Sequence, residues 1–425
     1  MKPVLPVASY FRRFGFCERQ IAAQTPPDLG LSVVIPCYDE PDLIGSLEAL
    51  RACERTKRGA EVIVVINSSA ESRDEVRRRN LKTFDLATAW AEGHSGPGLQ
   101  FHVLHFPDLP PKQAGVGLAR KIGMDEALRR FDEAGNLQGV IACFDADCRC
   151  ERNYLTSLER HFERNPRSIG CSIYFEHPLA AGPGTIEDEA IAAYELHLRY
   201  YVQGLRFAGF PYAHHTIGSS MAVRARTYLE QGGMNKRQAG EDFYFLQKVM
   251  PHGQFTDLKD TTVFPSPRPS HRMPFGTGKA VRDYLSTGES RTYPLQAFLD
   301  LRVFFEYVSE EIAGGRLPSW LLPGTQPESV RSFLQECGFA EAMQEIRENT
   351  ASKEAFRKRF FGWFDGFRVM KFMHHGRDKF YGGKMVAEEA EKLLRLMGEA
   401  KGFERGKEGT TGVFELLQNY RRLER

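Results

Sequence analysis

Short, continuous apolar runs alternate with stretches of helical periodicity in the first third of the chain, and this alternation limits the fold more than any other feature. The runs are LSVVIPC (31–37), AEVIVVINSS (60–69), LQFHVLHF (99–106) and GVIACFD (139–145). A stretch with apolar residues at helical spacing follows each of the first three runs. Apolar strands that alternate with helices indicate a mostly parallel sheet covered on both faces. The sequence therefore predicts an α/β fold of the Rossmann-like type.

Length and composition are those of a globular protein with more than one domain. With 425 residues, of which 42% are hydrophobic and 26% charged, the chain can form two or three domains with cores of their own. We expect a lead-in over residues 1–29, an α/β domain over 30–296 and a helical region over 297–425. The α/β domain would have two halves, 30–150 and 151–296.

Charge, cysteine content and hydropathy exclude several functional classes. A net charge of +2 gives no general attraction for nucleic acid, so no nucleic-acid partner is expected. The 8 cysteines follow no regular framework, which favours reduced thiols, and Cys148-x-Cys150 lacks the further ligands of a zinc site. The N-terminus has no signal-peptide pattern, and no apolar run reaches the roughly 18–20 residues that span a membrane. We therefore expect a cytoplasmic protein without a transmembrane segment.

Two aspartates, one residue apart, stand at the end of the fourth apolar run. Asp145 and Asp147 have the same parity, so both side chains point to one side of an extended chain. Two carboxylates on one side suit Mg²⁺ or Mn²⁺, and a plain turn rich in aspartate is the alternative. Ligands of parallel sheets bind at the carboxyl ends of the strands, where residues 36–39 and 67–68 also lie. Three polar clusters at one edge favour the functional interpretation.

A second acidic pair and a basic, proline-rich segment follow further along the chain. Glu241 and Asp242 precede an apolar helix, where a carboxylate either caps the helix or removes a proton from an acceptor hydroxyl. His271 lies between Arg268 and Arg272. Their segment either closes on a metal-bound diphosphate, with His271 as a ligand, or is an ordinary solvated loop.

Together these features resemble the family 2 glycosyltransferases, which have the GT-A fold. The matching stretches are LSVVIPCYDEPDLI for the first strand and turn, FDAD for the Asp-x-Asp motif and GSSMAVRARTYLEQGGMNKRQAGEDFYF for the acceptor side. The resemblance covers about residues 30–275 and implies a nucleotide half, an acceptor half and a helical C-terminal extension. It also implies a hexosyltransferase-like enzyme that moves a single sugar from a UDP- or GDP-sugar to the hydroxyl group of an acceptor that the sequence does not identify.

The resemblance implies a role for each candidate residue. Asp147 would hold Mn²⁺ or Mg²⁺, Asp145 would contact the sugar nucleotide and the cation, and His271 would be a third metal ligand. Asp242 would be the general base of an inverting transfer, with Glu241 beside it. The nucleotide pocket would be lined by Pro36, Tyr38, Glu40, Asn67 and Arg120.

The sequence departs from the family pattern at two points. The second strand usually ends in an aspartate that binds the base, and Asn67 stands there instead. An amide both donates and accepts hydrogen bonds, so uracil and guanine both stay open. The Gln-x-x-Arg-Trp motif of processive membrane synthases is missing, which favours single addition.

Two other functions compete with glycosyl transfer. In a magnesium-dependent phosphohydrolase, Asp145 and Asp147 would form the motif that carries the nucleophile. In such enzymes, however, that motif follows the first strand of the chain, whereas three strand-helix units precede it here. A non-catalytic sugar-nucleotide-binding protein is the other alternative, and the intact acidic residues count against it. The runs GVGLARKIG (115–123) and GTGK (276–279) lack the spacing of dinucleotide-binding and P-loop motifs.

Aromatic residues recur at helical spacing within residues 356–381, with basic residues between them. A helix packed on the rest of the protein explains this pattern. A face for peripheral contact with an anionic membrane is the alternative. The sequence leaves both interpretations open.

Overall fold

The computed structural model describes residues 6–179, 184–268, 276–314, 326–398 and 412–425. Two compact units divide the chain. The first holds the chain up to Pro178 together with Thr216–Ser266, and the second holds Leu179–His215 and the chain from Gly276 onward. The first unit is built on a large sheet and the second on helices.

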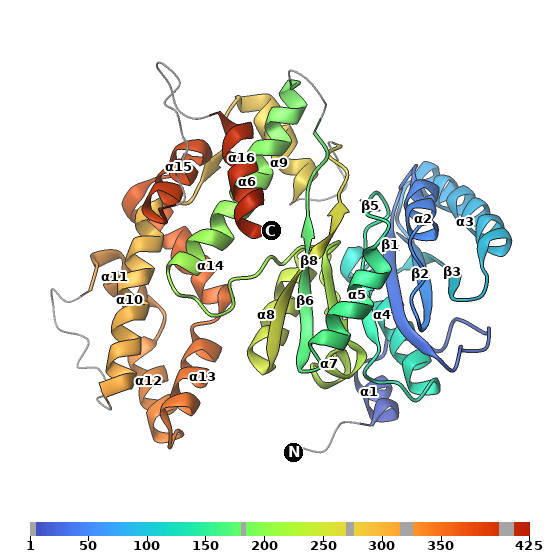
Figure 1. The fold of residues 1–425 in the computed structure, drawn as a ribbon, viewed down its shortest axis with the longest axis horizontal. Coiled ribbons are helices and arrows are strands. Elements are labelled where there is room, and N and C mark those ends of the chain that lie inside the picture. Colours follow the sequence, from blue (N-terminus) through green and yellow to red (C-terminus); the bar gives the residue numbers. More distant parts are fainter. Residues whose placement is uncertain (1–5, 180–183, 269–275, 315–325, 399–411) are drawn as a thin grey trace. The chain divides into compact units, whose positions relative to one another are not determined.

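Within the described residues, the first unit contains a mostly parallel sheet of eight strands (Figure 1). In spatial order the strands are β3 (Leu99–Leu109), β2 (Gly59–Ser69), β1 (Leu29–Cys37), β4 (Val140–Cys143), β7 (Met221–Arg224), β6 (Ser168–Phe175), β8 (Gln254–Phe264) and β5 (Arg149–Cys150). β3, β2, β1 and β4 are parallel neighbours, and they are the strands that the apolar runs predicted. β7 and β5 run antiparallel to their neighbours. The predicted α/β fold class is therefore confirmed.

The register of the parallel strands brings their carboxyl ends to one edge. Val34 of β1 is level with Ile63 of β2 and with Cys143, the last residue of β4. The segments that follow these strands therefore leave the sheet on the same side. This is the edge at which open α/β sheets bind ligands.

Helices flank this sheet (Figure 1). They are α1 (Val7–Phe14), α2 (Leu43–Arg51), α3 (Asp74–His94), α4 (Val116–Glu133), α5 (Tyr154–Arg164), α7 (Ala225–Glu230), α8 (Glu241–Val249) and the 3₁₀-helix η1 (Met250–His252). α4 is buried along most of its length. A side-chain carbon at Gly123 would lie 2.4 Å from Val34 Cγ1, so glycine allows α4 to pack directly on β1.

The glycines at the start of α4 also have a packing function. A side-chain carbon at Gly115 would lie 2.7 Å from Gln238 Cα, and one at Gly117 would lie 2.2 Å from the carbonyl oxygen of Arg237. The segment that leads into α8 therefore lies directly against the start of α4. This contact accounts for the glycines of the GVGLARKIG run without a dinucleotide.

A buried ion pair joins α4 to the sheet. Arg130 Nε donates to Glu61 Oε2 at 2.6 Å, with both side chains fully buried. Ser32 Oγ donates to Glu61 Oε1 at 2.8 Å, and Arg130 Nη1 donates to the carbonyl of Ala23 at 3.0 Å. Because each charge is shielded from water, removal of one partner leaves the other without compensation.

The second unit consists mainly of helices, which confirms the predicted helical C-terminal region. Its elements are α6 (Ile186–Phe207), α9 (Thr277–Thr287), β9 (Arg291–Thr292), α10 (Leu295–Gly314), α11 (Glu328–Glu336), α12 (Phe339–Glu348), α13 (Lys353–Trp363), α14 (Gly366–His375), the π-helix η2 (Gly376–Tyr381), β10 (Lys384–Met385), α15 (Val386–Leu396) and α16 (Val413–Glu424). This unit also contains α6, which lies within the expected acceptor half. The domain boundaries expected from the sequence stay a prediction.

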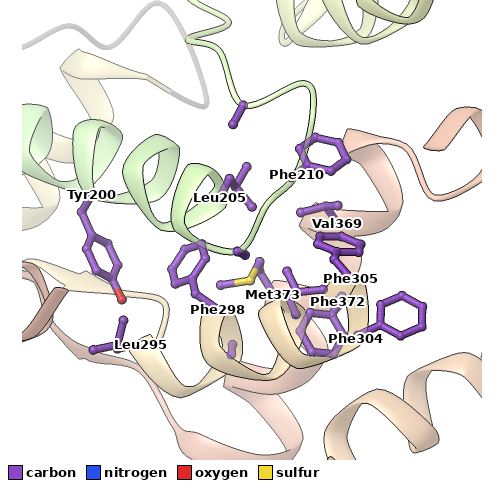
Figure 2. Packing of buried hydrophobic residues seen from close by; sticks show 14 of the residues in the cluster. Tyr200, Leu205, Phe210, Leu295, Phe298, Phe304, Phe305, Val369, Phe372 and Met373 are labelled. Carbon is purple, nitrogen blue, oxygen red and sulfur yellow. The ribbon is translucent and has the colours of Figure 1, made fainter. Parts of the chain in front are cut away.

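Aromatic side chains dominate the core of the second unit. Figure 2 shows Phe298, Phe304 and Phe305 of α10 in one cluster with Phe372 and Met373 of α14. The rings of Phe304 and Phe305 lie 5.6 Å apart between centroids. Ring pairs at such distances add to the stabilisation from apolar burial.

The aromatic residues of segment 356–381 belong to the same core. Phe356, Phe360 and Phe364 are buried there, whereas Arg357 and Lys358 between them are exposed. Packing therefore explains the aromatic pattern, and peripheral membrane contact through this segment stays a prediction. Within the described ranges, every helix is too short or too polar to span a lipid bilayer.

Replacing Glu61 with alanine should lower the free energy of unfolding by about 3–5 kcal/mol, because Arg130 is left buried without its partner. Glu230→Ala is the matched control. Glu230 pairs with Arg226 on α7 at 2.8 Å, but the two side chains are 40% and 34% exposed. Exposed pairs of this kind contribute about 0.3–0.5 kcal/mol. Urea unfolding followed by circular dichroism measures both variants, and equal losses would contradict the expectation.

Candidate functional site

The predicted Asp-x-Asp motif lies in the turn between β4 and β5. The side chains of Asp145 and Asp147 are partly exposed, and the N–H of Cys148 closes the turn by donating to the carbonyl of Asp145 at 3.1 Å. Ser46 of α2 fixes this turn, because its Oγ lies 2.8 Å from the carbonyl oxygen of Ala146 and 2.9 Å from that of Cys148. The two carboxylates are therefore presented on a backbone that α2 holds in place.

A buried arginine links this turn to the second acidic pair. Arg120 of α4 is 2% exposed, its Nη2 donates to Asp145 Oδ1 at 2.8 Å, and its Nη1 donates to Glu241 Oε1. A side-chain carbon at Gly218 would lie 2.7 Å from both terminal nitrogens of Arg120, so the backbone there closely approaches the guanidinium. Two acidic motifs that are far apart in the chain thus meet at one cation.

The second acidic pair opens α8. Gly240, with a φ of 69°, precedes the helix in a left-handed conformation that glycine adopts without strain. Asp242 Oδ1 accepts the N–H of Phe243 at 2.7 Å, so this carboxylate does bond to the helix start, as the capping alternative predicted. Glu241, by contrast, bonds to Arg120. Capping therefore accounts for only one of the two carboxylates.

The charges of this cluster change one another's ionisation. Burial lowers the pKa of Arg120, but the carboxylates of Glu241 and Asp145 raise it more, so the guanidinium stays charged. Burial raises the pKa of Glu241 to about 7 against the opposing effect of Arg120. Burial also raises the pKa of Asp242, again with Arg120 opposing it. A carboxylate with a raised pKa takes up a proton more readily, which suits a general base.

Four of the predicted nucleotide-binding residues lie near the ends of β1 and β2, and β1 is the neighbour of β4 in the sheet. Pro36 is buried within β1, and Tyr38, just beyond it, is 36% exposed. Glu40 is buried, and its Oε1 accepts the N–H of Asp42 at 2.9 Å, which supports the turn before α2. Asn67 is buried near the end of β2. Of these side chains, the Tyr38 ring is the most exposed.

Asn80 of α3 supports this part of the site, although no sequence pattern pointed to it. Its Nδ2 donates to the carbonyl of Asn67 at 3.0 Å, and its Oδ1 accepts the N–H of Asp39 at 2.9 Å. Asp39 has a φ of 52° and binds Arg79 through both carboxylate oxygens, at 2.6 and 2.9 Å. An asparagine in a charged helix gives no local signal, because its role depends on how α3 packs against two strand ends.

The structure brings together some of the predicted residues and leaves one undescribed. Arg120 contacts both Asp145 and Glu241, and Asp242 follows Glu241 in the same helix. Arg120 was expected to line the nucleotide pocket, and its bonds to both acidic pairs are an addition to that expectation. His271 lies outside the described residues, so its expected role as a metal ligand stays a prediction.

The donor chemistry of the acidic turn fits a hard divalent cation that arrives with a phosphate ligand. Within the described ranges, no group of three or more His, Cys, Asp or Glu side chains could hold a metal. Asp145 and Asp147 offer two carboxylates, one of which also binds Arg120. Mg²⁺ is usually held by one or two carboxylates together with substrate phosphates, so a complete cage of protein ligands is not required.

Comparison with known proteins finds a family match over part of the chain. Residues 32–230 match the family model described as Glycosyl transferase family 2. This range begins in β1, includes Arg120 and the Asp-x-Asp turn, and ends in α7 before the Glu241–Asp242 pair.

Solved structures show a weaker likeness. The S. aureus protein TarS, residues 1–349, is 13% identical, with 93% of this chain and 90% of that chain covered and a TM-score of 0.39. The complex of the same TarS fragment with UDP-GlcNAc gives 13% identity, the same coverage and a TM-score of 0.40. No curated protein matches the chain. The likeness to family 2 glycosyltransferases therefore rests on the sequence match over residues 32–230.

Arg120→Lys should weaken the binding of a nucleoside diphosphate in the presence of Mn²⁺ by about tenfold or more. One ammonium group cannot reproduce the two-armed contact of a guanidinium with two carboxylates, so Asp145 loses its fixed position. Arg129→Lys is the matched control, because Arg129 lies on the same helix and pairs with Glu126 instead. Calorimetric titration measures both variants, and equal affinities in the Arg120 variant and the control would contradict this role.

Proposed function

Residues 32–230 match the model of Glycosyl transferase family 2, and from this match we propose that the chain transfers a single sugar from a nucleoside-diphosphate donor to an acceptor hydroxyl. The observation that carries the proposal is the contact of Arg120 with both Asp145 and Glu241. Because Asp242, the candidate base, follows Glu241 directly in α8, this contact brings the Asp-x-Asp turn and the start of α8 into one site. Transfer needs both, because one group must bind the leaving diphosphate while another removes a proton from the acceptor.

Donor binding is assigned to the carboxyl edge of β1, β2 and β4. The ring of Tyr38 and the amide of Asn67 would contact the base, and an amide at this position accepts either uracil or guanine. Asp147 and Asp145 would hold Mn²⁺ or Mg²⁺ against the diphosphate. When bound, the cation neutralises charge on the leaving group. Arg120 would keep the carboxylate of Asp145 oriented at this position.

The transfer step is assigned to Asp242. Its carboxylate would take the proton of the acceptor hydroxyl, and the hydroxyl oxygen would attack the anomeric carbon while the bond to the diphosphate breaks. Attack from the side opposite the leaving group inverts the anomeric centre. The raised pKa of Asp242 supports this role. Glu241, bonded to Arg120, would position the start of α8 and not exchange protons with the substrate.

The phosphohydrolase alternative fits the geometry less well. It requires Asp145 as a nucleophile, yet Asp145 Oδ1 is engaged by a buried guanidinium at 2.8 Å. A carboxylate held in this way is a weaker nucleophile, because the cation stabilises its negative charge. A non-catalytic nucleotide-binding protein would bind the donor without turnover. The donor base, the sugar, the acceptor and a cytoplasmic location stay open to experiment.

Two substitutions should separate donor binding from transfer. Asp147→Ala should abolish metal-dependent binding of the nucleoside diphosphate, because the cation loses a carboxylate ligand. Asp242→Asn should leave that binding within about twofold and lower the rate of sugar transfer or donor hydrolysis by about 10²–10⁴-fold. Calorimetry with UDP and GDP gives the first quantity, and release of nucleoside diphosphate from UDP- and GDP-sugars gives the second. Wild-type turnover by Asp242→Asn would rule out its role as the base.

A further inference from the structure

Two thiols lie side by side next to the Asp-x-Asp turn. Cys53 Sγ and Cys150 Sγ are 3.7 Å apart. Cys53 follows the end of α2, and Cys150 is the last residue of β5, the short strand that leaves the turn. All 8 cysteines of the chain are free thiols in the structure. This pair therefore exists in its reduced form within reach of a covalent bond.

Backbone contacts hold the two segments together around the thiols. The N–H of Glu54 donates to the carbonyl of Arg152 at 2.8 Å. Cys53 Sγ also lies 3.4 Å from the carbonyl oxygen of Ala49 and 3.7 Å from that of Glu151. A disulfide needs a sulfur separation of about 2.05 Å. The two sulfur atoms therefore have to close by less than 2 Å from a starting distance of 3.7 Å.

We propose that Cys53 and Cys150 form a reversible disulfide when the protein meets a peroxide, and that this bond alters the adjoining Asp-x-Asp turn. Cys53 is 4% exposed and Cys150 is partly exposed, which favours a small oxidant. The neighbouring thiol protects the first oxidised sulfur by trapping it as a disulfide before further oxidation.

The reaction balances with one peroxide for each disulfide. A thiolate attacks one peroxide oxygen, the O–O bond breaks, and a sulfenic acid and hydroxide form. The second thiolate attacks the sulfenic sulfur, which forms the S–S bond and expels a second hydroxide. The two thiol protons combine with the two hydroxides as water, so the peroxide is reduced as the thiols are oxidised.

The local environment supports this pair over the other cysteines. The hydrogen bond between the two thiols lowers the pKa of Cys53 and raises that of Cys150, so Cys53 is the sulfur that attacks the peroxide first. Cys143 and Cys171 are fully buried, and burial raises the pKa of each. A zinc site does not explain the pair, because no metal-binding group of three or more ligands occurs among the described residues. Two adjacent thiols without further metal-ligating side chains around them in the described ranges can instead form a disulfide.

The effect on the turn follows from its attachment to α2. Arg149, next to Cys150, donates through Nη1 to Ser46 Oγ at 3.1 Å, and Ser46 in turn binds the carbonyls of the turn. Closing the sulfur gap pulls β5 toward the end of α2 and shifts Asp147, three residues away. A displacement near 1 Å at a reactive site lowers the reaction rate by up to about 10²-fold. We expect oxidation to weaken nucleoside-diphosphate binding about tenfold or more, an expectation that rests on the proposed function.

The test treats the reduced, full-length protein with hydrogen peroxide, removes the excess and maps its disulfides by mass spectrometry of unreduced peptides. A linked peptide that joins Cys53 to Cys150, and that dithiothreitol separates, is expected. Peroxide-treated Cys53→Ser and Cys150→Ser should lack it. Cys17→Ser is the matched control and should keep it, because burial raises the pKa of Cys17 to about 11. Unmodified thiols, or sulfinic acids without a disulfide, would overturn the proposal.

Calorimetry with UDP and GDP in Mn²⁺ then tests the effect on the turn. Oxidised wild type should bind about tenfold more weakly than reduced wild type, whereas peroxide should leave the affinity of Cys53→Ser unchanged. A mapped disulfide with unaltered affinity would overturn the link to the turn. If reduced protein binds neither nucleotide, the proposed function fails, while the peptide map still decides whether the disulfide forms.

Discussion

The guanidinium of Arg120 can stay buried and charged because two carboxylates, one from each acidic motif, accept its hydrogen bonds. Both carboxylates are needed. If Glu241 or Asp145 were removed, the desolvation cost of the buried guanidinium would be offset by only one carboxylate. The same bonds fix the Asp-x-Asp turn relative to the start of α8. One interaction thus determines both the stability of this region and the geometry of the candidate site.

Several other contacts in the first unit hold the side chain of Arg120 in place. Gly123 lets α4 approach β1, and Gly117 lets the segment before α8 lie against the start of α4. Farther along the same helix, Arg130 is anchored to Glu61 in β2. A helix fixed at both ends to the sheet and to α8 has little freedom to move Arg120. Ser46 and Asn80 provide similar support for the backbones of the turns that follow β4 and β1.

Much of this arrangement could be predicted from the sequence, because local patterns control it. Continuous apolar runs predicted β1, β2, β3 and β4 and the edge at which Asp145 lies, since strand periodicity and parallel pairing follow from local burial. The sequence also pointed to Arg120, Glu241 and Asp242 as site residues, and the structure places the first two in contact.

What could not be predicted depends on packing between distant segments. The hydrogen bonds of Asn80 and the contact of Cys53 with Cys150 join residues whose neighbours in sequence give no signal. The grouping of α6 with the C-terminal helices has the same origin, because its apolar face packs on α10, α15 and α16, which come much later in the sequence. The roles of the site residues in binding and transfer depend on a ligand, and these stay predictions.

A double-mutant cycle on nucleotide affinity tests the central claim most directly. The dissociation constant of UDP or GDP with Mn²⁺ would be measured by calorimetry for wild type, Arg120→Lys, Asp145→Asn and the double variant. If Arg120 acts on the donor site through Asp145, the losses are not additive, and the coupling energy is about 1 kcal/mol or more. Additive losses, or no binding of either nucleotide to folded wild type, would contradict the account.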